Sequence, residues 1–340
     1  MRALIIGGTG TISTAIVNLL AKTGWELVLL NRGKRAASLP QGAKRIQADI
    51  NDAQDVAQKI GNMRFDAVCQ FIGFCVEDVK RDFRLFHGRT RQYLFISSAS
   101  AYHKPAKCLR ITEGTSLANP YWQYSRDKIA CEEYLMRMYR EEGFPVTIVR
   151  PSHTYDEKKI PVAVHGKNGF WQVIKRMREE KPVIIHGDGS SLWTVTFSTD
   201  FAAGFAGLMG NPQAIGEAFQ ITSDESLSWD QIYQTIAEAL GVPFKPYHVS
   251  SDFLAAAGGQ YGLRGGLLGD KAVSVLFDNR KIKQAVPGFC PSVSFAQGVR
   301  RSLAYILAHE ECQVEDPEFD AWCDRVITVL EQAKKNFEPA

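Results

Sequence analysis

The chain has 340 residues, of which 45% are hydrophobic and 23% are charged, with 28 glycines and 14 prolines. This composition is ordinary for a globular protein and excludes disordered, collagen-like and coiled-coil chains. The 40 Lys and Arg residues stand against 37 Asp and Glu residues, a net charge of only +3, so nucleic acid is not expected as a partner.

The cysteines and the apolar runs indicate in which cellular compartment the protein is expected. The seven cysteines contain no Cys-x-x-Cys pair, and no cluster of His, Cys and Asp has metal-ligand spacing, so we expect neither disulfides nor a metal site. No apolar run reaches the roughly 20 residues that cross a bilayer. Gly7 and Gly8 interrupt the N-terminal apolar run, and no cleavage region follows. We therefore expect a cytoplasmic protein that does not bind membranes.

Residues 1–151 alternate between short apolar runs and amphipathic stretches, and we expect them to form a cofactor-binding domain. Strands without polar alternation are typical of a sheet covered on both faces. Strand–helix–strand repeats connect parallel strands. The pattern thus predicts an α/β fold of the Rossmann type with a doubly wound parallel sheet. Its predicted strands are 3–6, 27–30, 45–47, 67–72, 93–97 and 146–149, and its predicted helices are 11–23, 52–60, 76–87 and 120–142.

A glycine-rich loop with the sequence GGTGTIS occupies residues 7–13, directly after the first predicted strand. Glycines at this point let the backbone turn tightly and approach a pyrophosphate, which the N-terminus of the next helix then binds. A tight turn without a ligand is the structural alternative. The last small position is Ser13 instead of the glycine that close packing of helix on strand favours, so the match to the dinucleotide-binding pattern is slightly weaker.

The second predicted strand ends near Asn31. NAD-specific folds usually carry a carboxylate there, which binds the ribose 2′-hydroxyl. Here the sequence is neutral and then basic, Asn31-Arg32-Gly33-Lys34-Arg35. Positive charge suits a 2′-phosphate, so the sequence favours NADP over NAD, whereas a solvated basic turn would leave NAD open.

Two Tyr-x-x-x-Lys pairs occur, Tyr124 with Lys128 and Tyr155 with Lys159. Residues i and i+4 share one helix face, so the Lys ammonium can lower the pKa of the Tyr phenol and make it a general acid/base. The spacing alone is not specific, because chance accounts for such a pair in a chain of this length. Context has to separate the two pairs.

The first pair lies in a well-marked predicted helix, with Asn119 as N-cap, Pro120 at the first helical position and Gly143 at the end. The second pair follows strand-like residues and has a proline on either side, so we expect no helix there. Upstream of the first pair, the strand 93–97 ends in the serine-rich sequence SSAS at 97–100. Ligands of open parallel sheets bind at the carboxyl ends of the strands.

The alternation of short apolar runs and amphipathic stretches ends after residue 151. We expect a smaller, mixed α/β substrate-binding region in residues 152–191 and 211–315, with a helix near 169–180. Residues 192–210, a strand at 192–197 and a helix at 200–209, are expected to return to the cofactor domain. The glycine-rich stretch 258–269 is expected to form a mobile loop or lid, and 316–340 a C-terminal helix.

Six motifs in order give the chain a family resemblance over roughly residues 1–310. They are GGTGTIS at 7–13, Asp49-Ile50, Phe71-Ile72-Gly73, SSASAY at 97–102, YSRDK at 124–128 and RPSHTY at 150–155. The chain resembles the extended, atypical short-chain dehydrogenases/reductases of the NAD-dependent epimerase/dehydratase family. The resemblance implies a homodimer and a cofactor that is NAD or NADP.

The resemblance also implies roles for single residues. Ser98 would hold the reacting oxygen, Tyr124 would be the general acid/base, and Lys128 would bind the nicotinamide ribose and lower the pKa of Tyr124. Residues that would contact the substrate are Ser98, Ser100, His153 and Trp193. Those that would contact the cofactor are Gly7, Thr9, Gly10, Thr11, Ile12, Asn31, Arg32, Lys34, Asp49, Ile50, Gly73, Tyr124, Lys128, Pro151 and His153.

The chain departs from the family pattern at two positions. Relatives that act on nucleotide-diphosphate sugars usually carry an Arg after the Gly-Asp-Gly turn, here at 187–189, and Trp193 stands in its place. An indole does not replace a guanidinium, although its face suits a sugar ring. Gln70 stands where a His is common, which we expect to matter little. Either the substrate has no diphosphate, or other cations hold it: Lys158, Lys159, Lys167, Arg264 and Arg280.

These observations predict an NAD(P)-dependent enzyme of the epimerase/dehydratase kind. It would act on a sugar or sugar-like alcohol by hydride transfer with Tyr acid/base catalysis. A simple NADP-dependent dehydrogenase or reductase is the first alternative. The second is a non-catalytic protein of this fold that binds NAD(P) or RNA.

Overall fold

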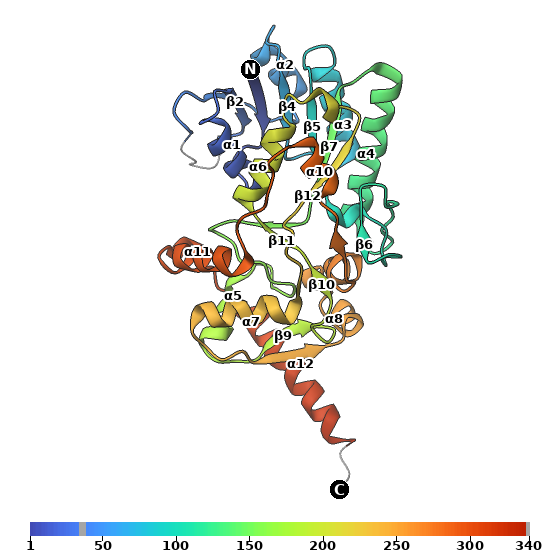
Figure 1. Cartoon of the computed structure of the whole chain (residues 1–340). Coiled ribbons are helices and arrows are strands. Elements are labelled where there is room, and N and C mark those ends of the chain that lie inside the picture. The colour runs from blue at the N-terminus through green and yellow to red at the C-terminus, as the bar shows by residue number, and fades with distance from the viewer. Residues whose placement is uncertain (34–38, 338–340) are drawn as a thin grey trace.

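The computed structural model describes residues 1–33 and 39–337, and a parallel sheet forms its upper half (Figure 1). Within the described chain this sheet has seven strands in the order β12-β7-β5-β4-β1-β2-β3, all parallel. The order changes direction beside β1, which is the switch point of a doubly wound sheet. The strands are β1 (Arg2–Ile6), β2 (Glu26–Asn31), β3 (Lys44–Gln47), β4 (Ala67–Gln70), β5 (Tyr93–Ile96), β7 (Val146–Pro151) and β12 (Ala218–Ile221).

Helices cover both faces of this sheet because its strands are apolar on both faces. Ala3 and Ile5 of β1 belong to the core under α1 and α6, whereas Leu4 and Ile6 belong to the core under α2, α3 and α4. All four side chains are fully buried. Each such aliphatic side chain contributes roughly 1.5–3 kcal/mol on burial. The helices are α1 (Thr11–Leu20), α2 (Ala53–Ile60), α3 (Val76–Phe86), α4 (Gln123–Glu142) and α6 (Ser198–Leu208). The predicted Rossmann-type fold is thereby confirmed.

A second core lies below the sheet and is built from mixed helices and short strand pairs (Figure 1). Its strand pairs are β9 (Val183–His186) with β14 (Pro246–Val249), β10 (Leu192–Trp193) with β13 (Leu227–Ser228), β8 (His153–Tyr155) with β11 (Val195–Phe197), and β6 (Arg110–Ile111) with β15 (Leu276–Phe277). Its helices are α5 (Trp171–Arg178), α7 (Trp229–Leu240), α8 (Ser251–Ala257), α11 (Phe295–Leu307) and α12 (Pro317–Lys335). The last begins at an Asp316 N-cap and lies within 316–340, where a C-terminal helix is predicted.

Two boundaries of the predicted regions are wrong. β12 lies inside 211–315 yet adds a parallel strand beside β7, and α10 (Arg280–Ala285) packs on β12 and α6. Conversely, β10 pairs with β13 instead of returning to the large sheet. Short apolar segments do not reveal which sheet edge they join, because that depends on partners far away in sequence. The remaining division into domains stays a prediction.

The glycine-rich stretch 258–269 is helical instead of an open loop. It forms the 3-10 turn η3 (Gly259–Tyr261), the helix α9 (Leu263–Gly266) and the first part of the π-helical turn η4 (Leu267–Lys271). Glycine is required here because a Cβ at Gly269 would lie 2.9 Å from the Cβ of Trp122. The stretch therefore packs against the segment that precedes α4.

The helix of the first Tyr-x-x-x-Lys pair begins at Gln123, three residues later than predicted, and ends at Gly143 as predicted. Asn119 is therefore not its N-cap. The Asn119 side chain instead accepts hydrogen bonds from the backbone N–H groups of Tyr121 and Trp122 and donates to the carbonyls of Ser100 and Gly269. Short 3-10 turns complete the described elements: η1 (Ala99–Ala101), η2 (Pro212–Ala214) and η5 (Glu310–Cys312).

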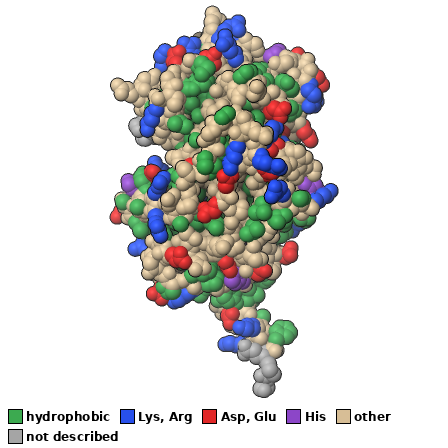
Figure 2. Space-filling view, viewed as in Figure 1, with side chains coloured by type: hydrophobic (Ala, Val, Ile, Leu, Met, Phe, Trp, Pro, Cys, Tyr) green, Lys and Arg blue, Asp and Glu red, His purple; other side chains and the backbone are tan. Residues whose placement is uncertain are grey.

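The visible face carries Lys, Arg, Asp and Glu side chains of both signs side by side (Figure 2). None of the described helices combines the length and the apolar character that crossing a bilayer requires. In the described chain no three His, Cys, Asp or Glu side chains group in a way that could hold a metal ion.

Candidate active site

A cleft of about 950 Å³ follows the carboxyl edge of the large sheet and reaches the second core. The glycine loop, the ends of β2, β4, β5 and β7, and the start of α4 form one side. Trp193, Asp270 and Lys271 come from the second core. The cleft thus lies where open parallel sheets bind their ligands.

The glycine loop has the geometry of a phosphate cradle. Gly7 has φ +85°, and a Cβ there would come within 2.5 Å of the Ile72 side chain. Ser13 closes the loop, because its hydroxyl donates to the carbonyl of Gly7 and accepts from the N–H of Gly10, both at 2.9 Å. Ser13 is 1% exposed, and its hydroxyl ties the loop to the start of α1. The N–H groups at the start of α1 have no intrahelical acceptors and face this cradle.

Asn31 and Arg32 line the cleft at the end of β2, as predicted, while Lys34 and Arg35 lie outside the described residues. The side-chain Nδ2 of Asn31 is buried and has no hydrogen-bond partner in the described chain. The Arg32 guanidinium lies 3.9 Å from the Asp49 carboxylate. A ribose therefore meets both a cation and a carboxylate here, and the structure does not single out a 2′-phosphate site. An extended dinucleotide fits this lining, because the cradle and the orphaned amide provide donors for its phosphates and ribose.

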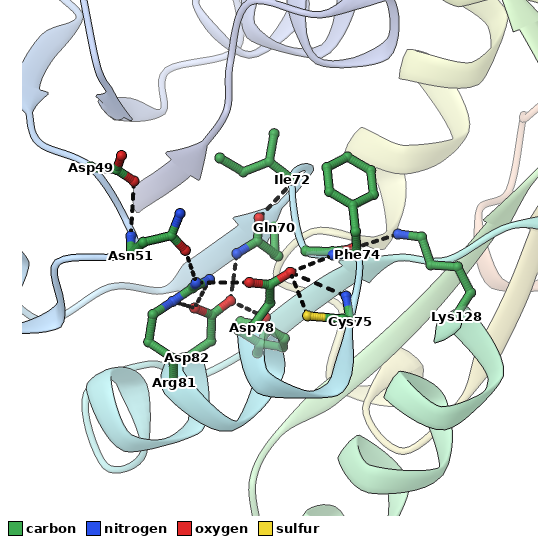
Figure 3. Close-up of polar contacts among 12 residues, drawn as sticks. Asp49, Asn51, Gln70, Ile72, Phe74, Cys75, Asp78, Arg81, Asp82 and Lys128 are labelled. Carbon is green, nitrogen blue, oxygen red and sulfur yellow. Dashed lines mark hydrogen bonds and ion pairs between the residues drawn. The ribbon is translucent and has the colours of Figure 1, made fainter. Parts of the chain in front are cut away.

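Gln70 organises the loop after β4 (Figure 3). Its amide donates to the buried Asp82 carboxylate, and its Oε1 accepts from the N–H of Ile72 at 2.8 Å. Tyr93 donates to the same carboxylate at 2.7 Å. Burial raises the pKa of Asp82, although the neighbouring Arg81 opposes the rise. Gln70 therefore matters more than expected, since it fixes the loop that forms one wall of the cleft.

Arg81 extends this network toward residues 49–51, two of which, Asp49 and Ile50, are predicted to contact the cofactor (Figure 3). Its guanidinium donates to Asn51 Oδ1 at 2.7 Å and to Asp78 Oδ1 at 3.0 Å. The other oxygen of Asp78 accepts from the N–H of Phe74 at 2.8 Å. One buried cation thus connects residues 49–51 with the loop 71–75. Asp49 and Ile50 line the cleft as predicted, whereas Gly73 is buried outside its lining and Ile72 and Phe74 line it instead.

Ser98, Tyr124 and Lys128 converge on the cleft, although 26 residues separate the serine from the tyrosine. The Ser98 hydroxyl lies 2.8 Å from that of Ser100, which accepts from Ser125 at 2.7 Å. A hydrogen bond with Ser98 also reaches the Tyr124 phenol. The Lys128 ammonium lies 5.8 Å from the centre of the Tyr124 ring.

The expected lowering of the Tyr124 pKa is wrong for this arrangement. Burial raises the pKa of Tyr124, and the hydrogen bond with Ser98 only partly opposes it. Burial also lowers the pKa of Lys128 to about 8. The Lys128 ammonium donates hydrogen bonds to the backbone carbonyls of Gly73 and Ile96, each at 2.7 Å. The Lys128 ammonium does not lower the pKa of Tyr124 because it points to the carboxyl edge of the sheet and not to the phenol oxygen.

A buried ion pair supports the segments that carry Ser98 and Lys128. Glu132, one turn after Lys128 on α4, receives three hydrogen bonds from the Arg150 guanidinium of β7 and one from the Ser97 hydroxyl. Both charged side chains are at least 94% buried. The pair joins α4, β5 and β7 next to Ser98, and no pattern in the sequence pointed to it.

The remaining predicted site residues lie on the side of the cleft where we expect the substrate. Pro151 and His153 line the cleft, and desolvation lowers the pKa of His153, with Lys159 and Lys271 adding to the effect. Trp193 also lines it but is only 1% exposed, with the Lys104 ammonium 4.9 Å from its ring centre. The Lys104 ammonium thus lies over the Trp193 ring, and contact of this ring with a sugar stays a prediction.

Of the cations considered for a diphosphate, only some reach a cavity. Lys159 lines the main cleft, and Lys158 lines an adjoining cavity of about 450 Å³. Lys167 and Arg280 pair with carboxylates outside both cavities, and Arg264 lines neither. Tyr155 is a strand residue with a buried, unpartnered hydroxyl in the described chain, as its lack of helical context predicted.

Several residues that line the cleft were not predicted as site residues. Trp122 lies just before α4, and Ile72 and Phe74 flank the predicted Gly73. Asp270 and Lys271 follow the glycine-rich stretch, whose prediction as a mobile lid concealed them. Signals existed for Trp122, which immediately precedes the Tyr124 helix, and for Ile72, which belongs to the motif Phe71-Ile72-Gly73.

Comparisons with known proteins agree with this geometry. The sequence profile of the NAD dependent epimerase/dehydratase family matches residues 3–222. A 2'-dehydrokanamycin reductase from Streptomyces kanamyceticus is 26% identical over 75% of this chain and 71% of its own length. The chloroplast stem-loop binding protein of 41 kDa b from Arabidopsis thaliana is 24% identical over 71% of this chain, and that match spans 64% of the plant protein.

Solved structures show the same architecture. The UDP-glucuronic acid 4-epimerase from Bacillus cereus, in complex with UDP-glucuronic acid and NAD, superimposes with a TM-score of 0.70 over 91% of this chain and 99% of that chain. Sequence identity is 18%, so this likeness concerns the fold alone.

Proposed function

The chain belongs to the NAD dependent epimerase/dehydratase family, and on this premise we propose that it transfers hydride between NAD(P) and a carbinol carbon of a sugar or sugar-like alcohol. The observation that carries the proposal is the convergence of Ser98, Tyr124 and Lys128 on one cleft with the glycine cradle. A bound nicotinamide dinucleotide supplies the hydride acceptor or donor.

Each of the three side chains has a defined task in this proposal. The Ser98 hydroxyl holds the reacting oxygen, and its contact with Ser100 fixes its direction. Tyr124 Oη takes the proton from that oxygen during oxidation and returns it during reduction. Burial raises the pKa of Tyr124, which favours the protonated phenol that donates in reduction. In oxidation the phenol must lose its proton before Oη can accept one from the carbinol. Lys128 retains one N–H beyond its two carbonyl contacts, and this N–H would bind the nicotinamide ribose.

Transient oxidation followed by return of the hydride, as in an epimerase or dehydratase, is the leading reaction. A net reductase is the second candidate, and the buried Trp193 favours it, because no guanidinium stands there to clamp a nucleotide diphosphate. The reductase relative supports the same alternative. NAD(H) follows from the family, and a preference for NADP rests on the basic stretch Asn31-Arg32-Gly33-Lys34-Arg35, of which the structure describes the first three residues.

Binding of RNA without catalysis is the other alternative, and one of the relatives is named a stem-loop binding protein. The nearly neutral net charge and the mixed charges on the visible face speak against a nucleic-acid surface. A Tyr–Ser pair held inside a dinucleotide cleft has no evident use in a protein that only binds RNA. A homodimer stays a prediction.

The first experiment identifies the nucleotide that copurifies when no cofactor is added, by denaturation and mass spectrometry. Retained NAD would support an internal redox cycle and would end the NADP preference. An empty protein that binds NADPH reversibly would support a reductase. Binding of neither dinucleotide would refute the proposal.

The second experiment tests the tyrosine. Tyr124→Phe should lower turnover roughly 10²- to 10⁴-fold, the usual contribution of a general acid/base, while dinucleotide affinity stays within about twofold. Tyr134→Phe, on the same helix but outside the cleft lining, is the matched control. Turnover that survives the Tyr124→Phe change would show that the acid/base assignment is wrong.

A further inference from the structure

Asp270 is a buried carboxylate without a full set of partners. It lies on the π-helical turn η4, is 9% exposed, and lines the cleft together with Tyr124. Its Oδ1 has no hydrogen-bond partner in the described chain. A buried acceptor that stays unsatisfied costs free energy, so a ligand that offers a donor at this point gains from it. Single π-helical turns inside helices often mark functional sites.

The position of Asp270 relative to the reaction centre is fixed by its neighbour. The Asn119 amide donates to the carbonyl of Gly269 at 2.7 Å and to that of Ser100 at 2.8 Å. The same amide therefore ties η4 to the serine turn after β5. Gly269 and Gly265 pack directly on Trp122, two residues before Tyr124. The carboxylate is close enough to raise the pKa of Tyr124 through its charge.

The charges around Asp270 indicate the kind of donor. The Lys271 ammonium lies 3.7 Å from Oδ2, and the buried Lys104, whose charge also acts on Asp270, stacks on Trp193. Two ammonium groups beside one carboxylate leave a local surplus of positive charge. A neutral hydroxyl satisfies Oδ1 without adding to that surplus, whereas a substrate ammonium would be repelled. The Nε1 of Trp193, also buried and unpartnered in the described chain, adds a donor in the same lining.

We propose that Asp270 determines specificity by accepting a hydrogen bond from a substrate hydroxyl next to the carbinol that Tyr124 serves. The substrate is then a polyhydroxylated ring with a vicinal diol at the reacting position. This inference rests on the proposed function and adds the part of the substrate that is recognised. Asp270 binds and does not itself transfer a proton to the reacting oxygen.

The test compares matched sugars on matched variants. The probes are methyl α-D-glucopyranoside, its 2-, 3- and 4-deoxy analogues and its 2-amino-2-deoxy analogue, with NAD⁺ and with NADP⁺ in turn and reduced cofactor followed at 340 nm. The variants are Asp270→Ala, the isosteric Asp270→Asn and, as control, Asp252→Asn at an exposed position of α8. All are compared with the wild type and Tyr124→Phe.

The wild type should favour the parent glycoside over one deoxy analogue and over the amino analogue by roughly 10- to 100-fold in kcat/KM. In Asp270→Ala this preference should fall to within about twofold through KM, while dinucleotide affinity is unchanged. If Asp270→Ala does not fold, Asp270→Asn must reduce the preference at least threefold. Preference that survives in a folded Asp270 variant overturns the inference and leaves the proposed function standing. If no probe is oxidised, or if Tyr124→Phe oxidises as well as the wild type, both fail.

Discussion

The ammonium of Lys128 lies 2.7 Å from the carbonyl oxygen of Gly73, 55 residues earlier in the chain. A second carbonyl, that of Ile96, accepts from the same nitrogen at 2.7 Å. One buried cation thereby fixes the helix of Tyr124 to the ends of β4 and β5. The Lys128 ammonium, which the Tyr-x-x-x-Lys spacing associates with Tyr124, therefore also holds one wall of the dinucleotide cleft.

Lys128→Met should separate function from stability. The pKa of Lys128, about 8 in the folded protein against 10.5 as its ordinary value, means that burying its charge costs about 3 kcal/mol below pH 8. Met fills a similar volume without this cost, and the lost carbonyl contacts offset part of the gain. We expect unchanged or higher stability in urea at pH 7, with dinucleotide affinity and turnover each reduced at least tenfold.

The pH dependence gives the same variant a second readout. Between about pH 8 and 10.5 the unfolded wild type holds a proton on Lys128 that the folded protein has lost, so this group makes stability rise with pH in that window. The rise should be absent from Lys128→Met and present in the surface control Lys80→Met. A destabilised Lys128→Met protein with normal turnover would contradict the assignment.

Glu132→Gln should be strongly destabilising. The change leaves the Arg150 guanidinium, 6% exposed, without its buried counter-ion and weakens the bond from Ser97. Removal of one partner from a buried pair costs roughly 3–5 kcal/mol. Urea denaturation measures this loss. Glu133→Gln, exposed on the same helix, should change stability by less than about 0.5 kcal/mol. A loss below 1 kcal/mol for Glu132→Gln would show that water or another group replaces the carboxylate.

Arg32 decides the preference between the two dinucleotides if the 2′-phosphate binds there. Its guanidinium is 60% exposed and faces Asp49 at 3.9 Å. Arg32→Ala should weaken NADPH binding by roughly 10- to 100-fold and change NADH binding by less than threefold, as expected for one charged hydrogen bond. Asp49→Asn should strengthen NADPH binding. Fluorescence titration with both reduced dinucleotides measures this, with Arg84→Ala as the distant control. Equal effects on both dinucleotides would end the NADP interpretation.

The buried His186 and the half-buried His153 and His165 should make the protein sensitive to mild acid. Burial lowers the pKa of His186 from 6.5 to about 4, and His153 and His165 shift in the same direction. The unfolded chain therefore binds more protons than the folded protein between pH 6.5 and 4, and stability must fall as the pH decreases through this range. For His186 alone the loss is about 3 kcal/mol.

His186→Gln tests this origin. The variant should lose part of the slope of unfolding free energy against pH between 6.5 and 4. His87→Gln, at an exposed position, should keep the full slope. Identical slopes in His186→Gln and the wild type would show that other groups cause the acid sensitivity.

Much of the fold could be predicted because its signals are local. Six of the seven strands of the large sheet, all but β12, follow from apolar runs within short windows, and the glycine loop and the C-terminus of α4 at Gly143 follow from glycine positions and helical spacing. Tyr124 was distinguished from Tyr155 in the same way, because capping residues and prolines act over a few residues. The start of α4 was misplaced because Asn119 bonds Gly269, 150 residues away, as well as its own neighbours.

Other features depend on tertiary contacts. The buried face of Trp193, the direction of the Lys128 ammonium, the Glu132–Arg150 pair and the position of Asp270 beside Tyr124 all join segments far apart in the chain. Such contacts leave no period or spacing in the sequence, since the packing of distant elements alone creates them. The sequence by itself therefore determined the parallel sheet, its dinucleotide loop and the tyrosine helix. Only the folded chain decided which side chains face the substrate, because burial and charge in the cleft depend on both cores at once.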